Sequence, residues 1–184
     1  MATVIAGMTM SLDGFVEDEQ GSAGALYPDL EELQDAPYLK AMQAETGAVL
    51  MGRRTFDMAG DADDYADSYE LQVPIFVVTH TPPAVEPKRN ERLSFTFVTD
   101  GVRSAVAQAT EAAGERAVTV VGGVDLTRQL LDADLVDELC VDVMPVLLGG
   151  GRRLFEGSRS TVLEKLRVDE AGMRTSLRFR VPSR

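Results

Sequence analysis

Cysteine, histidine and tryptophan are almost missing from this sequence. Its 184 residues include one cysteine (Cys140), one histidine (His80) and no tryptophan. A single cysteine can form neither an internal disulfide nor a cysteine-based zinc site. With only one histidine as well, a His/Cys metal centre is disfavoured, and we expect no metal site.

Positive charge is also scarce. The chain has 18 Lys and Arg against 30 Asp and Glu, a formal net charge of −12. Nucleic-acid binding needs a basic surface that neutralises phosphates, so we expect no nucleic-acid partner. The N-terminus lacks the pattern of a secretory signal, and no apolar run reaches the length of a spanning helix. We therefore expect a cytoplasmic protein of bacterial type, without a membrane partner.

No repeat and no low-complexity linker divides the chain. Hydrophobic residues make up 45% of the sequence and charged residues 26%, which is ordinary for a globular protein. The length corresponds to one domain, and a domain of this size buries roughly two-thirds of its unfolded surface. We predict a single domain spanning residues 1–184.

Short β-rich runs alternate with helical patterns. The predicted strands are residues 3–11, 48–51, 74–79, 95–98, 117–121, 138–144 and 173–181. The predicted helices are residues 35–45, 101–113 and 124–133. Strand–helix alternation in the first two-thirds indicates a parallel sheet, and the strand-rich last third indicates added antiparallel strands. The predicted class is α/β with a mixed, mostly parallel sheet.

Two of the later strands carry finer expectations. Residues 173–181 alternate between apolar and polar side chains, as expected of an exposed antiparallel edge strand. In residues 138–144, Cys140 is expected to be a small buried hydrophobic side chain and Asp142 to point outward. The segments 17–37, 59–70 and 81–92 are expected to be surface connections.

Glycine-bearing turns stand where the predicted strands end. Gly52 opens the run Gly-Arg-Arg-Thr, and Gly122-Gly123 follows the strand at 117–121. Glycine lets a backbone turn tightly against a ligand, and the N-terminus of a following helix attracts phosphate. Arg53 and Arg54 would add positive charge. Neither turn has the spacing G-x-G-x-x-G or the P-loop pattern, and each alone is more often a simple turn.

In their order, these motifs resemble a known family. The turns at Gly52 and Gly122-Gly123 are similar to the cofactor turns of dihydrofolate reductases. Residues 10–15 (Met-Ser-Leu-Asp-Gly-Phe) and 145–151 (Pro-Val-Leu-Leu-Gly-Gly-Gly) resemble the reductase domain of the bifunctional riboflavin-biosynthesis deaminase-reductase and its stand-alone bacterial relatives. The resemblance runs from about residue 3 to residue 181.

The resemblance implies a dihydrofolate reductase-like three-layer fold and NADPH-dependent reduction of a small heterocycle, either a pteridine, a pyrimidine or a flavin precursor. It also implies a homodimer that pairs through residues 138–144 and 173–181. The cofactor-binding residues that it implies are Asp13, Gly14, Gly52, Arg53, Arg54, Thr55, Thr79, His80, Gly122, Gly123, Val124, Leu126 and Thr127.

Two carboxylates are the candidate catalytic residues. Asp13 would lie near the nicotinamide, where it could bind ribose hydroxyls or relay a proton, although Asp-Gly is also a common turn. Asp35 resembles the acidic residue on the first helix that binds the pteridine ring in the reductases. The sequence does not decide between these two groups.

Two other functions stay open. The chain could hold NADP as a sensor or scaffold without turnover, because it offers few catalytic groups. It could also be an interaction module whose glycine turns are purely structural. Oxidation of NADPH by a panel of substrates separates the first from an enzyme, and binding of NADPH separates the second from both.

Overall fold

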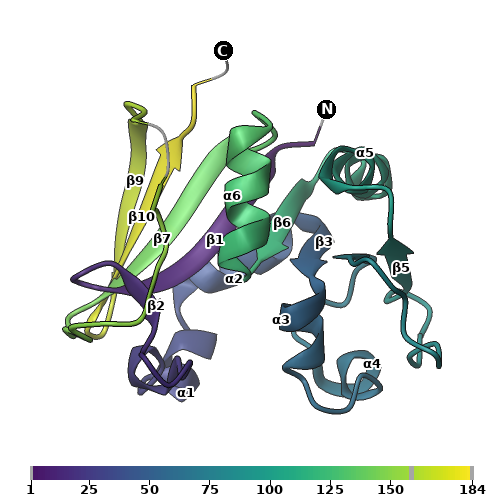
Figure 1. The fold of residues 1–184 in the computed structure, drawn as a ribbon, viewed down its shortest axis with the longest axis horizontal. Coiled ribbons are helices and arrows are strands. Elements are labelled where there is room, and N and C mark those ends of the chain that lie inside the picture. The colour runs from purple at the N-terminus through teal and green to yellow at the C-terminus, as the bar shows by residue number, and fades with distance from the viewer. Residues whose placement is uncertain (1, 158–159, 183–184) are drawn as a thin grey trace. The chain divides into compact units, whose positions relative to one another are not determined.

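The computed structural model describes residues 2–157 and 160–182, and it has the predicted α/β class (Figure 1). The chain forms two compact units. The first comprises Met1–Ala6 and Gln43–Val136, and the second comprises Gly7–Met42 and Asp137–Arg184. Strand β1 (Val4–Ser11) begins in the first unit and ends in the second.

The first unit is built on a parallel sheet. Its strands are β3 (Thr46–Gly52), β4 (Ile75–Val78), β5 (Phe95–Val98) and β6 (Ala117–Val121), in the order β5-β4-β3-β6 with the start of β1 next to β6. The pairs β3–β4, β3–β6 and β4–β5 are all parallel. Strands in such a sheet are covered on both faces, which explains the continuous apolar run of β3.

Helices and aromatic side chains cover this sheet. The helices are α3 (Arg53–Asp57), α4 (Asp64–Ser68), α5 (Val102–Ala113) and α6 (Val124–Asp132). Val49 and Met51 of β3 join a core with Phe56 of α3 and Tyr65 of α4, whose rings stack with centroids 5.6 Å apart. Helix α5 packs against β3, β4 and β6.

The second unit ends in antiparallel strands. Strands β7 (Glu138–Met144), β10 (Arg174–Arg180) and β9 (Glu164–Ala171) lie side by side, with the end of β1 next to β7 (Figure 1). Both β7–β10 and β10–β9 are antiparallel. The short strands β2 (Phe15–Glu17) and β8 (Arg152–Arg153) form a separate pair. The helical segments are η1 (Gly24–Leu26), α1 (Leu30–Gln34) and α2 (Pro37–Glu45), whose last residues belong to the first unit.

Most predicted elements are confirmed, and β5, β6 and β7 have the predicted bounds. The assignment of residues 173–181 as an edge strand is wrong, because β10 lies between β7 and β9. The edge strand next to β10 is β9. Its sequence is highly charged, so a search for alternating apolar residues does not find it, and such charges suit an exposed edge. The segments expected to be plain connections contain α1 and α4.

A single domain over residues 1–184 remains a prediction, and residues 1, 158, 159, 183 and 184 lie outside the described part. Within the described part, no helix is both long and apolar enough to cross a membrane.

Gly47 gives a test of the first unit's packing. A Cβ built on Gly47 would lie 2.7 Å from the Ala113 carbonyl oxygen and 2.8 Å from Arg116 Cβ. We expect Gly47→Ala to lower the free energy of unfolding by about 1–3 kcal/mol, because backbone and side chain must shift to admit the methyl group. Urea unfolding measures this loss. The control is Gly24→Ala, where the added Cβ meets only Ser22 Oγ at 3.4 Å, and an equal loss in both variants would contradict the packing argument.

Candidate functional site

Most of the predicted cofactor-binding residues gather at one edge of the first unit. They follow the carboxyl ends of β4, β3 and β6, which are neighbours in the sheet, and ligands of open parallel sheets bind at that edge. The residues that lie there are Gly52, Arg53, Arg54, Thr55, Thr79, His80, Gly122, Gly123, Val124, Leu126 and Thr127. The structure therefore brings together predicted residues from three separate parts of the chain.

The Gly122-Gly123 turn packs against Thr55. Both glycines have left-handed backbone angles, with φ of 61° and 82°. A Cβ built on Gly122 would lie 3.1 Å from Thr55 Cγ2 and 3.2 Å from Thr55 Oγ1. The turn therefore needs glycine both for its backbone angles and for the space beside Thr55.

Helix α6 begins directly after this turn and provides the helix N-terminus at this edge. The unpaired N–H groups of its first turn point toward the strand ends. Its nine residues also give it a larger helix dipole than the five-residue helix α3. Thr127 in the first turn is 2% exposed, and its hydroxyl has no hydrogen-bond partner among the described residues. Leaving a buried hydroxyl without a hydrogen-bond partner lowers the stability of a fold by about 1–3 kcal/mol.

These features fit the pyrophosphate and ribose of a dinucleotide. The turn lets backbone N–H groups approach an anion closely, and the Thr127 hydroxyl lacks the partner that a ribose or phosphate oxygen could supply.

Arg53 is engaged with its own unit. Its Nε donates to both oxygens of Asp57, at 2.8 and 3.0 Å, and its Nη1 donates to the Thr81 carbonyl oxygen at 2.8 Å. Arg53 therefore ties α3 to the loop after β4, while the neighbouring Arg54 is exposed.

The loop after β4 is closed by Thr79. The Thr79 hydroxyl donates to the Thr81 carbonyl oxygen at 2.9 Å and accepts from the Thr81 N–H at 3.2 Å. Thr79 is buried, and His80 at the tip of this turn is exposed. His80 is therefore the residue of this pair whose side chain is open to a ligand.

Asp13 lies in the second unit and holds two loops together. Its carboxylate accepts from Ser11 Oγ at 2.6 Å and from the backbone N–H groups of Leu148 and Gly149 at 3.1 and 2.8 Å. These hydrogen bonds, that of Ser11 first, lower the pKa of Asp13 to about 2. Asp13 is therefore ionised at neutral pH and fastens the Gly149 turn to the turn at Gly14.

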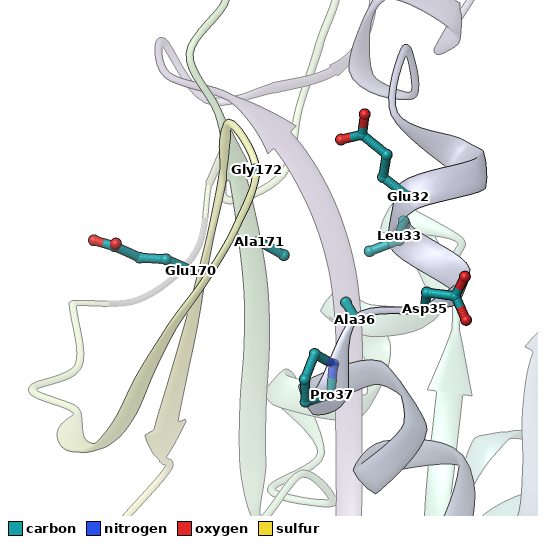
Figure 2. A pocket seen from close by; sticks show the side chains of 8 residues that line it. All are labelled: Glu32, Leu33, Asp35, Ala36, Pro37, Glu170, Ala171 and Gly172. Carbon is teal, nitrogen blue, oxygen red and sulfur yellow. The ribbon is translucent and has the colours of Figure 1, made fainter.

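Asp35 stands between α1 and α2, beside a small pocket of the second unit (Figure 2). The pocket has a volume of about 230 Å³. Its lining residues are Glu32, Leu33, Asp35, Ala36, Pro37, Glu170, Ala171 and Gly172. The Asp35 carboxylate accepts from Lys40 Nζ at 2.7 Å, and this ion pair lowers its pKa. The side chain of Asp35 is 85% exposed, so it stays a solvated anion.

A buried charge network in the second unit was not predicted from the sequence. The fully buried guanidinium of Arg174 forms a two-pronged ion pair with Asp29, at 2.8 and 3.2 Å, and donates to Asp142 Oδ2 at 3.3 Å. It also donates to Thr9 Oγ1 and to the Leu26 carbonyl oxygen, both at 3.0 Å. Removing one partner of such a buried pair typically costs about 3–5 kcal/mol.

The expectation that Asp142 points outward is wrong. Its side chain is only 16% exposed, and Tyr38 Oη donates to Asp142 Oδ2 at 3.0 Å. Residues two apart on a strand share a face, so Asp142 lies on the same face as Cys140. The useful signal was a lone carboxylate inside an apolar strand, whereas nothing in the sequence marked Arg174 as its partner.

No group of three or more His, Cys, Asp or Glu side chains suited to a metal ion occurs within residues 2–157 and 160–182.

Comparison with known proteins assigns the fold. Residues 2–177 match the family described as the RibD C-terminal domain. The uncharacterized protein YwjB of Bacillus subtilis is 26% identical over 176 residues, which cover 94% of each chain. A solved protein of Shewanella sp. PV-4 ascribed to riboflavin biosynthesis has a TM-score of 0.76 at 24% identity and covers 99% of both chains.

A dihydrofolate reductase of Enterococcus faecalis, solved with NADP(H), has a TM-score of 0.64 at 18% identity and covers 98% of this chain and 97% of its own. The predicted dihydrofolate reductase-like fold is confirmed.

The low pKa of Asp13 can be tested through Ser11. We expect Ser11→Ala to raise the pKa of Asp13 from about 2 toward the usual value for Asp, because the strongest hydrogen bond to the carboxylate is lost. Because folding lowers this pKa, the stability that Asp13 contributes is present above pH 4 or so and is lost as the pH falls toward 2. Carboxyl-carbon NMR titration measures the midpoint. Ser22→Ala is the control, and an unchanged Asp13 midpoint in Ser11→Ala would contradict the assignment.

Proposed function

The chain belongs to the RibD C-terminal domain family, and from this we propose that it is an NADPH-dependent reductase of a small heterocycle. The substrate class is a pteridine, a pyrimidine or a flavin precursor. The observation that supports this most directly is the Gly122-Gly123 turn, which packs on Thr55 and leads into α6 with the unpartnered hydroxyl of Thr127.

Each part of the sheet edge has a proposed role. Gly52, Arg54 and Thr55 would contact the phosphates, with Arg54 reaching the 2′-phosphate as well, and Arg53 would hold the loop after β4 in place. Thr79 and His80 would lie near the adenosine ribose and its 2′-phosphate. The turn residues Gly122 and Gly123, with Val124, Leu126 and Thr127 of α6, would line the pyrophosphate and the nicotinamide ribose. NADPH, when bound, supplies a hydride, and the protein supplies orientation and exclusion of water.

The catalytic carboxylates are proposed to act as anions. Asp13, with Gly14 beside it, would lie near the nicotinamide, and Asp35 would face the heterocycle. Because the pKa values of Asp13 and Asp35 are both lowered, neither stores a proton at neutral pH. Each would instead accept a hydrogen bond and so position a water molecule or a ligand N–H group.

The alternative is a protein of the same fold that holds NADP without turnover, as a sensor or scaffold. The engagement of Asp13 with the Gly149 turn favours this reading, because it leaves few groups for proton transfer. Oxidation of NADPH, followed by absorbance against a panel of pteridines, pyrimidines and flavin precursors, decides between the two. Saturable NADPH binding without oxidation by any member of the panel would favour the scaffold.

The glycine turn gives the sharpest test of cofactor binding. We expect Gly123→Val to abolish detectable NADPH binding, because a side chain here strains a backbone with φ of 82° and occupies the space of the pyrophosphate. Gly114→Val is the matched control, since its φ of 64° imposes similar strain and an added Cβ meets nothing within 4 Å. Fluorescence titration and thermal melting are measured on both variants. If Gly123→Val binds NADPH as well as Gly114→Val does, the turn is only a connector.

We also expect a preference for NADPH over NADH. A charge-assisted contact to the 2′-phosphate is worth about 1.5–3 kcal/mol, or roughly ten- to a hundredfold in affinity. Replacing Arg54 by alanine should narrow this preference, whereas Arg92→Ala, on an exposed loop, should leave it unchanged. Calorimetry at moderate salt gives the six affinities of the three proteins for the two cofactors, and equal dissociation constants for the two cofactors in the parent protein would refute the assignment.

A homodimer is the proposed assembly. The charged strand β9 suits an exposed edge, so pairing would use a sheet face rather than that edge. Val141, Leu177 and Val168 form one apolar row across β7, β10 and β9, and Val168 is 48% exposed. Light scattering at tens of micromolar should give about twice the chain mass of 19.9 kDa. Val168→Glu should shift the measured mass toward that of a single chain. A single-chain mass for the parent protein would end this proposal.

A further inference from the structure

The two carboxylate oxygens of Asp142 have different surroundings. Oδ2 accepts two hydrogen bonds, from Tyr38 Oη at 3.0 Å and from Arg174 Nη1 at 3.3 Å. Oδ1 is buried and has no donor among the described residues. A buried carboxylate oxygen is a strong acceptor, and native structures rarely leave one without a partner.

Arg174 cannot supply the missing donor. Its Nε–H and one Nη2–H bond to Asp29, the other Nη2–H bonds to the Leu26 carbonyl oxygen, and the two Nη1–H groups bond to Thr9 and Asp142 Oδ2. A guanidinium has five N–H donors, so all of them are used. Arg174 therefore fixes the carboxylate of Asp142 and leaves Oδ1 free to accept.

The charge of the network indicates what kind of donor is missing. One guanidinium faces two carboxylates, those of Asp29 and Asp142, so the buried cluster carries an excess negative charge. Tyr38 adds no charge to the cluster, because burial and then the charge of Asp142 raise the pKa of its phenol and keep it protonated and neutral. A donor with positive character, such as an N–H group of a protonated heterocycle, completes both the hydrogen bond and the charge balance.

We propose that Asp142 is a ligand-binding residue whose Oδ1 accepts a hydrogen bond from an amino or ring N–H group of the heterocyclic substrate. Tyr38 and Arg174 are positioning residues that act through Asp142. This inference rests on the proposed function, since it assumes that the chain binds a nitrogen heterocycle. In this proposal, the buried carboxylate of Asp142 on β7 recognises the N–H donors of the ligand. Asp35, by contrast, is solvated and paired with Lys40.

A pair of probes that differ only in donors tests the proposal. The probes are 2,4-diaminopyrimidine, which presents N–H donors, and 2,4-dimethoxypyrimidine, which has none. The parent protein should bind the diamino probe at least tenfold more tightly in NMR titrations. Asp142→Asn should abolish or reverse this preference, because the amide keeps an acceptor for Tyr38 and Arg174 and turns its NH₂ donors toward the ligand.

Asp169→Asn is the matched control. Asp169 lies in the same row as Asp142, since both are register partners of Ser176 on β10, and it pairs with Arg167. This variant should keep the parent's preference. A folded Asp142→Asn protein with an unchanged preference, or a parent protein without a preference, overturns the proposal and leaves an internal water as the partner of Oδ1.

Tyr38→Phe decides the question if Asp142→Asn does not fold. It removes one orienting hydrogen bond but keeps the carboxylate and the aromatic ring, so the preference should fall at least threefold while the melting temperature stays close to that of the parent. An unchanged preference in this variant also overturns the proposal.

NADPH affinity is measured on the same samples without probe. Loss of NADPH binding in the parent contradicts the proposed function alone, because the probe preference is read independently of it.

Discussion

Two successive left-handed residues at the end of β6 are the constraint on which the candidate cofactor site depends. Gly122 and Gly123 turn the chain so that α6 begins at the carboxyl edge of the parallel sheet, with Thr55 within 3.2 Å of where a side chain on Gly122 would stand. Residues with a Cβ adopt such angles only at a cost. The start of α6, the position of Thr127 and the contact with Thr55 of α3 all follow from this turn.

The second unit is organised by electrostatics rather than by a backbone turn. Arg174 lies at the centre of a buried network in which every guanidinium donor has a partner, and it joins β10 to β7, to the end of β1 and to the segment before α1. Burying ionised groups is tolerated only when they are paired and hydrogen-bonded. Among the polar side-chain atoms of this network, Asp142 Oδ1 is the one without a partner in the described part of the chain, and for this reason we propose it as the ligand acceptor.

The sequence was most informative where local chemistry decides the structure. Apolar runs located β5, β6 and β7, and the need for glycine located the turn after β6. Prediction from the sequence failed where a residue far away in the chain decides the local structure. Strand β9 reads as a charged segment and becomes a strand only through β10, and Asp142 is turned inward by Arg174 and Tyr38. The hydrogen bonds from the Gly149 turn to Asp13 likewise join two motifs that the sequence showed separately.

We propose that the turn after β6 and the start of α6 hold a dinucleotide through backbone N–H groups. Amide NMR spectra recorded during a titration with NADPH observe these groups individually. We expect saturable shifts of the Gly122, Gly123 and Val124 amides, and none at Gly114, which ends α5 elsewhere in the same unit. If saturating NADPH leaves the amides of the turn unmoved, the turn does not bind the dinucleotide.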